Sequence, residues 1–321
     1  MTNTMDLNTF SAGLTFDLNA SLGLIRASGA DARSFLHSQL TQDVLKLGEN
    51  DVRLAGYCSA KGRMYAMFHI WADGETVYLL TQRSVMETVL KRLRMFVLRA
   101  KVVLEDVSEQ YVISGYVGAD ALVEQTRVTE GDTVRLGILR AVISEANTTL
   151  LREIRISTVP LNTDSDNIER WQWLDIRAGI AHVTAEISEA FVPQMMNLDR
   201  IGGVNFKKGC YPGQEIVARS HYLGKSKRRM QAASIRFTNA AERDEAVTQL
   251  HIGMDVYSSA DSAQPAGQLL AYALSPLNDT QMDVLYEVSL PLLENDAQLS
   301  LKDITAPWQH RELPYLLSDP T

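Results

Sequence analysis

Hydrophobic and polar residues alternate in short runs over the first eighty residues, with the period of β-strands that bury one face. These runs lie at residues 14–18, 22–27, 52–57, 64–71 and 76–81. Lys61-Gly62 and Asp73-Gly74 are typical turn residues between strands. The last three runs are therefore expected to form an antiparallel meander.

Two stretches of the same region switch to helical spacing. The first begins after Asp31, a favourable cap residue, and places Phe35, Leu36 and Leu40 on one side. The second covers residues 86–97. Its apolar positions are Val89, Leu93, Phe96 and Val97, and the basic residues along it are Lys91, Arg92, Arg94, Arg99 and Lys101. The pattern favours an amphipathic helix with a solvated basic face.

The rest of the chain predicts more strands and two further helices. Strands are expected at 112–117 and 150–159 around a helix at 120–125, and a second helix is capped by Asp166 with Glu169 three residues later. Beyond residue 231, short apolar runs alternate with turn residues at 234–237, 254–257, 268–274, 282–288 and 298–304. These runs predict a small C-terminal β-barrel and an α+β fold overall.

The composition is that of a folded, multidomain protein. With 321 residues and 45% hydrophobic content, the chain can bury a sizeable core and is long enough for two or three domains. No apolar run approaches the roughly 18–20 residues of a membrane span. Residues 1–6 lack the charged and apolar regions of a signal peptide. We therefore expect a cytoplasmic protein with no membrane partner.

The cysteines, histidines and sequence motifs of the chain exclude several kinds of metal and nucleotide site. Cys58 and Cys210 are the only cysteines, which excludes a disulfide framework and a zinc ribbon. An ordinary iron–sulfur cluster needs four protein ligands, so this chain cannot hold one alone with thiolates. The histidines show no metal-ligand spacing, and we expect no metal site. Walker-type loops, dinucleotide-binding glycine motifs and H-E-x-x-H are absent from the sequence.

Charge is distributed unevenly along the chain. The net charge is −8, yet residues 207–229 carry +6, which leaves −14 on the remainder. A basic segment on an acidic protein attracts a polyglutamyl tail, a phosphate backbone or an acidic partner. A solvated loop explains the same run without any ligand. Both interpretations stay open at this point.

A thiol within the basic segment lies next to a predicted turn. Pro212 and Gly213 suit the two central positions of a type II turn, so Cys210 enters a tight bend. Gly209 has no side chain and leaves one side of the sulfur open.

Cations surround the same thiol in the sequence. Lys207 and Lys208 precede Cys210 and Arg219 follows it, and fixed positive charge favours the thiolate over the thiol. His221 is also near, so a Cys-His hydrolase or transferase is an alternative. A free cysteine is otherwise most often a small buried hydrophobic residue.

The helix predicted after Asp166 offers a second candidate site. Ile168, Trp171 and Leu174 share one face, whereas Trp173 lies about 200° away. An inward tryptophan usually belongs to the core, and spacing alone favours packing over ligand contact.

The thiol segment carries a family resemblance. It reads Lys208-Gly209-Cys210-Tyr211-Pro212-Gly213-Gln214-Glu215, with Arg219 after it. This motif resembles the signature of the YgfZ family, folate-binding proteins linked to iron–sulfur proteins and tRNA modification and related in fold to the glycine-cleavage T-protein. Weaker similarities at 29–44, 58–64, 194–206 and 313–315 extend the resemblance over most of the chain.

The resemblance implies a fold and a cofactor. Residues 1–233 are expected to form two interleaved antiparallel α/β domains that bind folate, and residues 234–321 the C-terminal β-barrel. Tetrahydrofolate or a derivative is the implied ligand. The implied pocket residues are Trp171, Leu22, Asp175 and Arg177. A flat pterin or aminobenzoyl ring can stack on an indole face.

Three departures from the patterns of the family and of the T-protein change the expected chemistry. Arg177 stands where the T-protein has a glutamate that helps to hold the pterin, and Leu22 stands where some family members have a tryptophan. Tyr65 and Ala66 align with an acidic pair that aminomethyl transfer requires. Without a carboxylate there, developing positive charge on folate has no partner, so we do not expect an aminomethyltransferase.

The resemblance therefore implies a folate-binding accessory protein whose partners are iron–sulfur enzymes or their assembly factors, with Cys210 as the working thiol opening onto the folate cavity. A folate-dependent one-carbon transferase is the alternative. A third interpretation is an RNA-binding module that uses residues 207–229, including Lys225, Lys227, Arg228 and Arg229, with tRNA as a possible partner.

Overall fold

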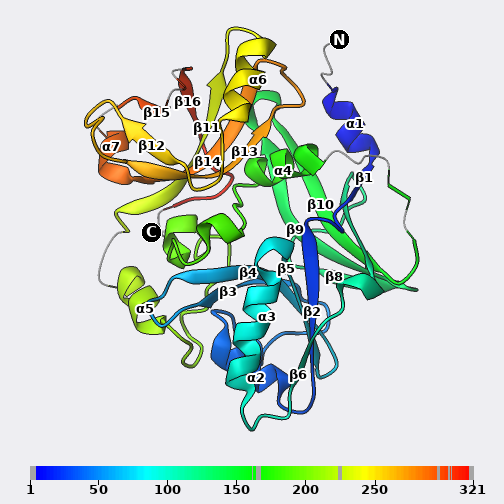
Figure 1. Cartoon of the computed structure of the whole chain (residues 1–321). Coiled ribbons are helices and arrows are strands. Elements are labelled where there is room, and N and C mark those ends of the chain that lie inside the picture. The colour runs from blue at the N-terminus through cyan, green and yellow to red at the C-terminus, as the bar shows by residue number, and fades with distance from the viewer. Residues whose placement is uncertain are drawn as a thin grey trace.

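The structure is a computed structural model that describes residues 5–160, 162–163, 168–222, 226–294, 297–302, 304 and 306–317. Within them, the chain forms three antiparallel sheets with helices packed around and between them (Figure 1). Among the described residues, no helix combines the length and apolar composition that a membrane crossing needs.

The first sheet has the strand order β1-β7-β10-β9-β8. Its strands are β1 (Leu14–Asp17), β7 (Val112–Val117), β8 (Arg127–Glu130), β9 (Thr133–Ile143) and β10 (Thr148–Ser157), and α1 (Leu7–Ala12) precedes β1. Because β1 pairs with β7, the chain leaves this sheet after Asp17 and returns to it at Val112.

The second sheet, in the order β3-β4-β5-β2-β6, contains the meander predicted from alternation. Its strands are β2 (Leu22–Ser28), β3 (Arg53–Cys58), β4 (Met64–Asp73), β5 (Thr76–Gln82) and β6 (Val103–Asp106). The helices α2 (Ala32–Gln39) and α3 (Arg83–Val97) pack against it. The apolar positions Phe35, Leu36, Val89 and Leu93 are buried as predicted.

Two details of these helices differ from the prediction. Asp31 occupies the N-cap position of α2, but its carboxylate makes no cap bond and instead accepts from the backbone N–H of Lys101 at 2.8 Å. Phe96 is 50% exposed, whereas Val97 in the same turn packs against the core beside the second sheet.

The third sheet has the open order β15-β12-β13-β14-β11-β16, with β15 and β16 at opposite edges. Its strands are β11 (Arg228–Arg236), β12 (Asp255–Ser258), β13 (Gly267–Leu274), β14 (Gln281–Ser289), β15 (Leu299–Leu301) and β16 (Trp308–Arg311), with α6 (Ala240–Thr248) and α7 (Leu290–Glu294) beside them. β11 pairs with β14 from Arg228 to Arg236, so the boundary expected between 233 and 234 falls inside a strand.

α4 (Ile168–Arg177) lies between the first and third sheets, in contact with β1 and β9 on one side and β13 and β14 on the other (Figure 1). Both faces of the helix are therefore covered. Trp171 and Trp173 are both buried, although they point about 200° apart. The predicted cap residue Asp166 lies outside the described residues.

The remaining elements are short. They are α5 (Gln214–Tyr222) and the 3₁₀ turns η1 (Ser108–Gln110), η2 (Ser144–Ala146), η3 (Ala185–Ile187) and η4 (Pro193–Met196). The chain from η3 to α5 connects α4 to the third sheet and carries the thiol segment.

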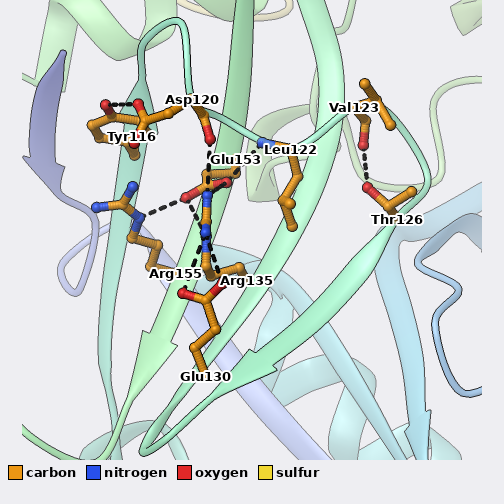
Figure 2. A network of polar contacts seen from close by, with 9 residues as sticks. All are labelled: Tyr116, Asp120, Leu122, Val123, Thr126, Glu130, Arg135, Glu153 and Arg155. Carbon is orange, nitrogen blue, oxygen red and sulfur yellow. Dashed lines mark hydrogen bonds and ion pairs between the residues drawn. The ribbon is translucent and has the colours of Figure 1, made fainter.

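A buried carboxylate organises the loop before β8. Glu153 accepts from Arg135 Nε and Nη2 at 2.9 Å, from Arg155 Nε at 2.6 Å and from the backbone N–H of Leu122 at 2.9 Å (Figure 2). The helix predicted at 120–125 is wrong. The Leu122 amide is directed to Glu153 rather than along a helix axis, and Gln125 has a φ of +63°.

Candidate functional site

A cavity of about 300 Å³ lies where the three sheets and α4 meet. Leu22 and Met67 line it from the second sheet, Ile138 and Ile154 from the first, and Leu270 from the third. Small-molecule sites are usually concave, largely apolar and fixed by a few polar groups. This cavity has the apolar walls that such a site needs.

The polar side of the cavity is a chain of charged and ionisable groups. Arg152 is fully buried, and its Nη1 donates to Asp175 Oδ1 at 2.8 Å while its Nε donates to the carbonyl of Leu139 at 3.0 Å. Asp175 Oδ2 lies 3.2 Å from His182 Nε2. Burial alone would raise the pKa of Asp175, but Arg152 and His182 outweigh it and hold that pKa below its usual range. The carboxylate is therefore ionised.

Trp171 forms part of the same wall. It is 4% exposed, its ring lies 5.7 Å from that of Phe16, and the guanidinium of Arg152 lies 5.0 Å from its centroid. A side chain at Gly115 would come within 2.6 Å of the indole, so glycine is needed there for the ring to fit. Trp171 thus serves packing and also lines the cavity.

Three of the four residues implied for folate lie together. Leu22, Trp171 and Asp175 all line the cavity. Arg177 is not among the lining residues. Its guanidinium instead binds Asp283 at 2.7 Å, so it joins α4 to the third sheet.

Arg152, His69 and His182 also line the cavity, although no sequence pattern predicted them there. Burial lowers the pKa of His69 to about 3, with His182 adding to the effect, so His69 is neutral at physiological pH. These residues lie on β10, on β4 and after α4, and no local spacing relates them. The sequence offered one signal. Arg152 is a cation within the strand predicted at 150–159, and charged residues in buried strands often belong to functional sites.

The thiol segment folds as its turn residues predict. The backbone N–H of Gln214 donates to the carbonyl of Tyr211 at 3.1 Å, and Gly213 has a φ of +79°, as the second central position of a type II turn requires. A side chain at Gly213 would lie 2.5 Å from the Cα of Gly62. The turn therefore packs directly on the β3–β4 hairpin, and only glycine fits the contact.

Cys210 is exposed at this turn, and Cys58 is buried. Burial raises the pKa of Cys58 to about 12, so that thiol stays protonated. Cys210 does not line the cavity, and the structure does not bring the predicted thiol and the predicted ligand pocket together. His221 stacks on Phe206, with ring centroids 3.8 Å apart.

Lys208 is buried beside the thiol turn. Its ammonium donates to the carbonyls of His37 and Leu40, the latter at 2.7 Å, and lies 4.9 Å from the Tyr211 ring. Burial lowers the pKa of Lys208 to about 8, while Asp43 and Cys210 act in the opposite direction. Lys208 therefore caps the carbonyl end of α2 and also interacts with the sulfur through its charge.

The other signature residues lie around this turn. Gln214 Nε2 is 3.5 Å from the carbonyl oxygen of Lys208. Gly209, Glu215 and Arg219 are exposed, and Tyr211 is buried. Among the described residues, no group of three or more His, Cys, Asp or Glu side chains is arranged to hold a metal ion.

The basic segment is partly structural. Arg228 pairs with Glu287 at 2.5 Å and Arg229 with Asp199 at 2.6 Å, so these two cations stabilise the third sheet and the loop before it. Lys207 and Lys227 are exposed. Lys225 lies outside the described residues.

The chain and its fold are similar to those of known proteins. No protein-family model matches the chain. It is 30% identical over 313 residues to proteins named tRNA-modifying protein YgfZ from Shigella boydii and Escherichia coli, covering 92% of this chain and 91% of each relative. Among solved structures, it is similar in fold to the glycine cleavage system aminomethyltransferase T from Bartonella henselae. The TM-score is 0.62 at 11% identity, over 96% of this chain and 87% of that one.

Proposed function

Because the chain belongs to the YgfZ family, we propose that it is a cytoplasmic, folate-binding accessory protein that supports iron–sulfur enzymes, including enzymes that modify tRNA. The observation that supports folate binding is the cavity, in which Trp171 lies beside the hydrogen-bonded residues Arg152, Asp175 and His182. In this proposal the chain before β11 forms two interleaved subdomains around the ligand. The third sheet, which begins with β11 at Arg228, is the core of the C-terminal domain predicted at 234–321.

The cavity residues fit a folate. A volume of about 300 Å³ is at the lower end of the roughly 300–1,000 Å³ of small-molecule sites, so it suits the heterocycle while the glutamyl tail stays outside. Trp171 offers an indole for ring stacking, with Leu22 as an aliphatic wall. Arg152 Nη2 is a buried donor without a hydrogen-bond partner, and such a donor favours a ligand that supplies an acceptor. Tetrahydrofolate, when bound, supplies a carrier for one-carbon groups.

In this proposal the protein residues bind and orient. Asp175 and His182 supply polar contacts at the ring edge, and Arg152 holds Asp175 in place and ionised. Arg177 acts at a distance, because its bond to Asp283 fixes the position of α4 and hence of Trp171. The apolar walls contributed by all three sheets shield part of the bound ring from water.

Cys210 acts outside the cavity in this proposal. It is exposed, and its setting at a turn allows a partner protein to reach the sulfur. One thiolate supplies at most one of the four ligands of an ordinary cluster, so any contact with iron is shared with the partner. The partners are therefore iron–sulfur enzymes or their assembly factors.

A fluorescence titration tests the folate site. Adding tetrahydrofolate to the full-length protein is expected to quench tryptophan emission, and Trp171→Phe is expected to weaken the response. Trp308→Phe is the matched control, because Trp308 packs on Tyr286 in the third sheet and does not line the cavity. No quenching at millimolar ligand, or equal effects of the two substitutions, would remove the folate claim.

A genetic test addresses the thiol. Cys210→Ala is expected to leave folding intact but to abolish support of an iron–sulfur enzyme in cells, measured as that enzyme's specific activity. Cys58→Ala is expected to have a much smaller effect, because Cys58 is a core residue. Equal effects of both substitutions contradict a working role for Cys210.

A second candidate, a folate-dependent one-carbon transferase, is favoured by one observation. The cavity holds an ionised carboxylate next to a histidine, a pair suited to proton transfer. Tyr65 and Ala66, the residues aligned with the T-protein acidic pair, do not line it. Spectral change of methylene-tetrahydrofolate on adding an amine or thiol acceptor, lost in Asp175→Asn, supports turnover. Binding without turnover supports the accessory role.

A further inference from the structure

The surface around Cys210 is assembled from two segments far apart in the sequence. The β3–β4 hairpin turn at 59–63 packs on the thiol turn, since a side chain at Gly213 would meet Gly62 and one at Gly62 would lie 3.0 Å from Ile216 of α5. Figure 1 shows α5 beside the ends of β3 and β4. The hairpin turn and the thiol turn therefore form one continuous surface.

Cations dominate this assembled surface. Lys61 and Arg63 on the hairpin, and Lys207 and Arg219 on the thiol segment, are all exposed. Arg63 also donates to the carbonyl of Ala190 and keeps its charge. Within 59–63 and 205–222, Glu215 is the one carboxylate, and the exposed Glu189 lies on the adjoining loop. A protein with a net charge of −8 thus presents a local excess of positive charge here.

Aromatic rings accompany these cations. His221 stacks on Phe206 with centroids 3.8 Å apart and an interplanar angle of 10°. Tyr222 meets His221 edge-on at 4.9 Å and Phe206 at 6.2 Å, and it is 67% exposed. A tyrosine so exposed contributes little to the core, whereas its ring face is open to a ligand. The stacked pair beneath holds it in place.

We propose that this face binds a single-stranded nucleic acid, with phosphates on the cations and unpaired bases on Tyr222 and His221. Single-strand sites combine a basic groove with aromatic side chains on which bases stack. A duplex keeps its bases paired and stacked along its length, so it offers these rings open base faces only at its two ends. An acidic protein would use the cations but would not need an exposed stacking ring. The proposal does not depend on folate, because none of these residues lines the cavity.

Fluorescence anisotropy of labelled 12-nucleotide strands with the full-length protein tests the proposal. Single-stranded RNA is expected to bind at low salt, with log K falling against log salt at a slope of about −2 to −3 for three or four phosphates. Titration of the matching DNA strand shows whether the face prefers RNA or DNA. A duplex of the same sequence is expected to bind at least about tenfold more weakly than the single strand.

Variants assign the binding to this face. Tyr222→Ala is expected to weaken binding about tenfold with little change in the salt slope, whereas Tyr222→Phe retains it. Replacing Lys207 and Arg219 by glutamine is expected to reduce the slope by about 1.4. The double glutamine variant of Lys91 and Arg99, exposed cations on and just after α3, is the matched control and is expected to bind as the native protein does.

Four outcomes overturn the proposal. They are no binding of either strand at low salt, equal binding of the duplex, equal weakening in the Lys91 and Arg99 control, and binding that Tyr222→Ala leaves unchanged. If polyglutamate binds as tightly as the strands and is indifferent to Tyr222→Ala, the face is a docking site for an acidic protein instead. Thermal unfolding of each variant establishes that it is folded.

Discussion

Arg177 on α4 and Asp283 on β14 form a buried ion pair, with Nη2 and Oδ2 2.7 Å apart. The same carboxylate accepts from Trp173 Nε1 at 2.6 Å and from Ser234 at 2.6 Å. Burial would raise the pKa of Asp283, but Arg177 and Arg311 outweigh it and hold that pKa below its usual range. Asp283 therefore fastens the third sheet to the helix that carries Trp171.

Removing this carboxylate should be costly. Asp283→Asn removes the buried countercharge of Arg177 and leaves it only the half-exposed Glu145, and we expect the free energy of unfolding to fall by about 3–5 kcal/mol. Urea denaturation measures the change. Asp244→Asn removes an exposed partner of Arg243 and is expected to cost less than about 1 kcal/mol. Equal losses in the two variants would contradict the assigned role of Asp283.

The buried His69 predicts an acid-sensitive stability. Burial lowers its pKa to about 3 in the folded protein, with Arg152, Asp175 and His182 around it, whereas the unfolded chain binds the proton near the ordinary pKa of about 6.5. Stability is therefore lost as the pH falls below about 6.5, by about 2 kcal/mol down to about pH 4.5.

His69→Gln should flatten this pH dependence, because the variant has no imidazole to protonate at that position. Urea midpoints across the acid range measure it, and His251→Gln, which changes an exposed histidine, is expected to keep the native slope. An unchanged slope in His69→Gln refutes the assignment.

The two cysteines should differ sharply in reactivity. Cys210 is exposed, whereas burial raises the pKa of Cys58 to about 12, so a thiol reagent is expected to modify one site in the native protein. Mass spectrometry after brief alkylation identifies it. Lys208→Met is expected to slow the reaction several-fold because a buried ammonium is lost, and Lys207→Gln, which changes an exposed charge, is expected to slow it less. Native labelling of Cys58 contradicts the assignment.

The turn next to the thiol should tolerate only glycine at its second central position. Gly213→Ala adds left-handed strain of about 1–2 kcal/mol and also a clash with the hairpin at Gly62. Gly74→Ala is the matched control, because Gly74 also has a positive φ but nothing lies near its missing side chain. Gly213→Ala is therefore expected to lower the unfolding midpoint more than Gly74→Ala. Similar midpoints mean that the hairpin contact contributes nothing.

Sequence patterns correctly predicted the elements that depend on interactions between residues close together in the chain. The β3–β4–β5 meander and the turn at Gly213 were recognisable because alternation and turn chemistry act between near neighbours. The helix predicted at 120–125 failed because Glu153, some thirty residues away, takes the Leu122 amide. α6 was missed because Ala246 is its buried residue, too little for an apolar stripe.

The residues of the candidate site also fall into two groups, those that the sequence indicates and those that only the tertiary fold brings together. Cys210 and its neighbouring cations could be singled out because they are contiguous in sequence. Trp171 was singled out through the family resemblance, since helical spacing alone indicates packing. Arg152, His69 and His182 come from separate elements, and only the tertiary fold brings them to one cavity. The separation of Cys210 from that cavity likewise results from tertiary packing, and the spacing of residues in the sequence could not predict it.

Since the walls of the cavity come from all three sheets, any ligand bound there would be thermodynamically coupled to docking of the third sheet. A chain terminated before Arg228 would lose Leu270 and the ion pair at Asp283 together, and with them one wall of the cavity. A small molecule bound in the cavity would therefore stabilise the packing of the third sheet on the rest of the chain. A protease-protection assay would register this as slower release of the last ninety or so residues.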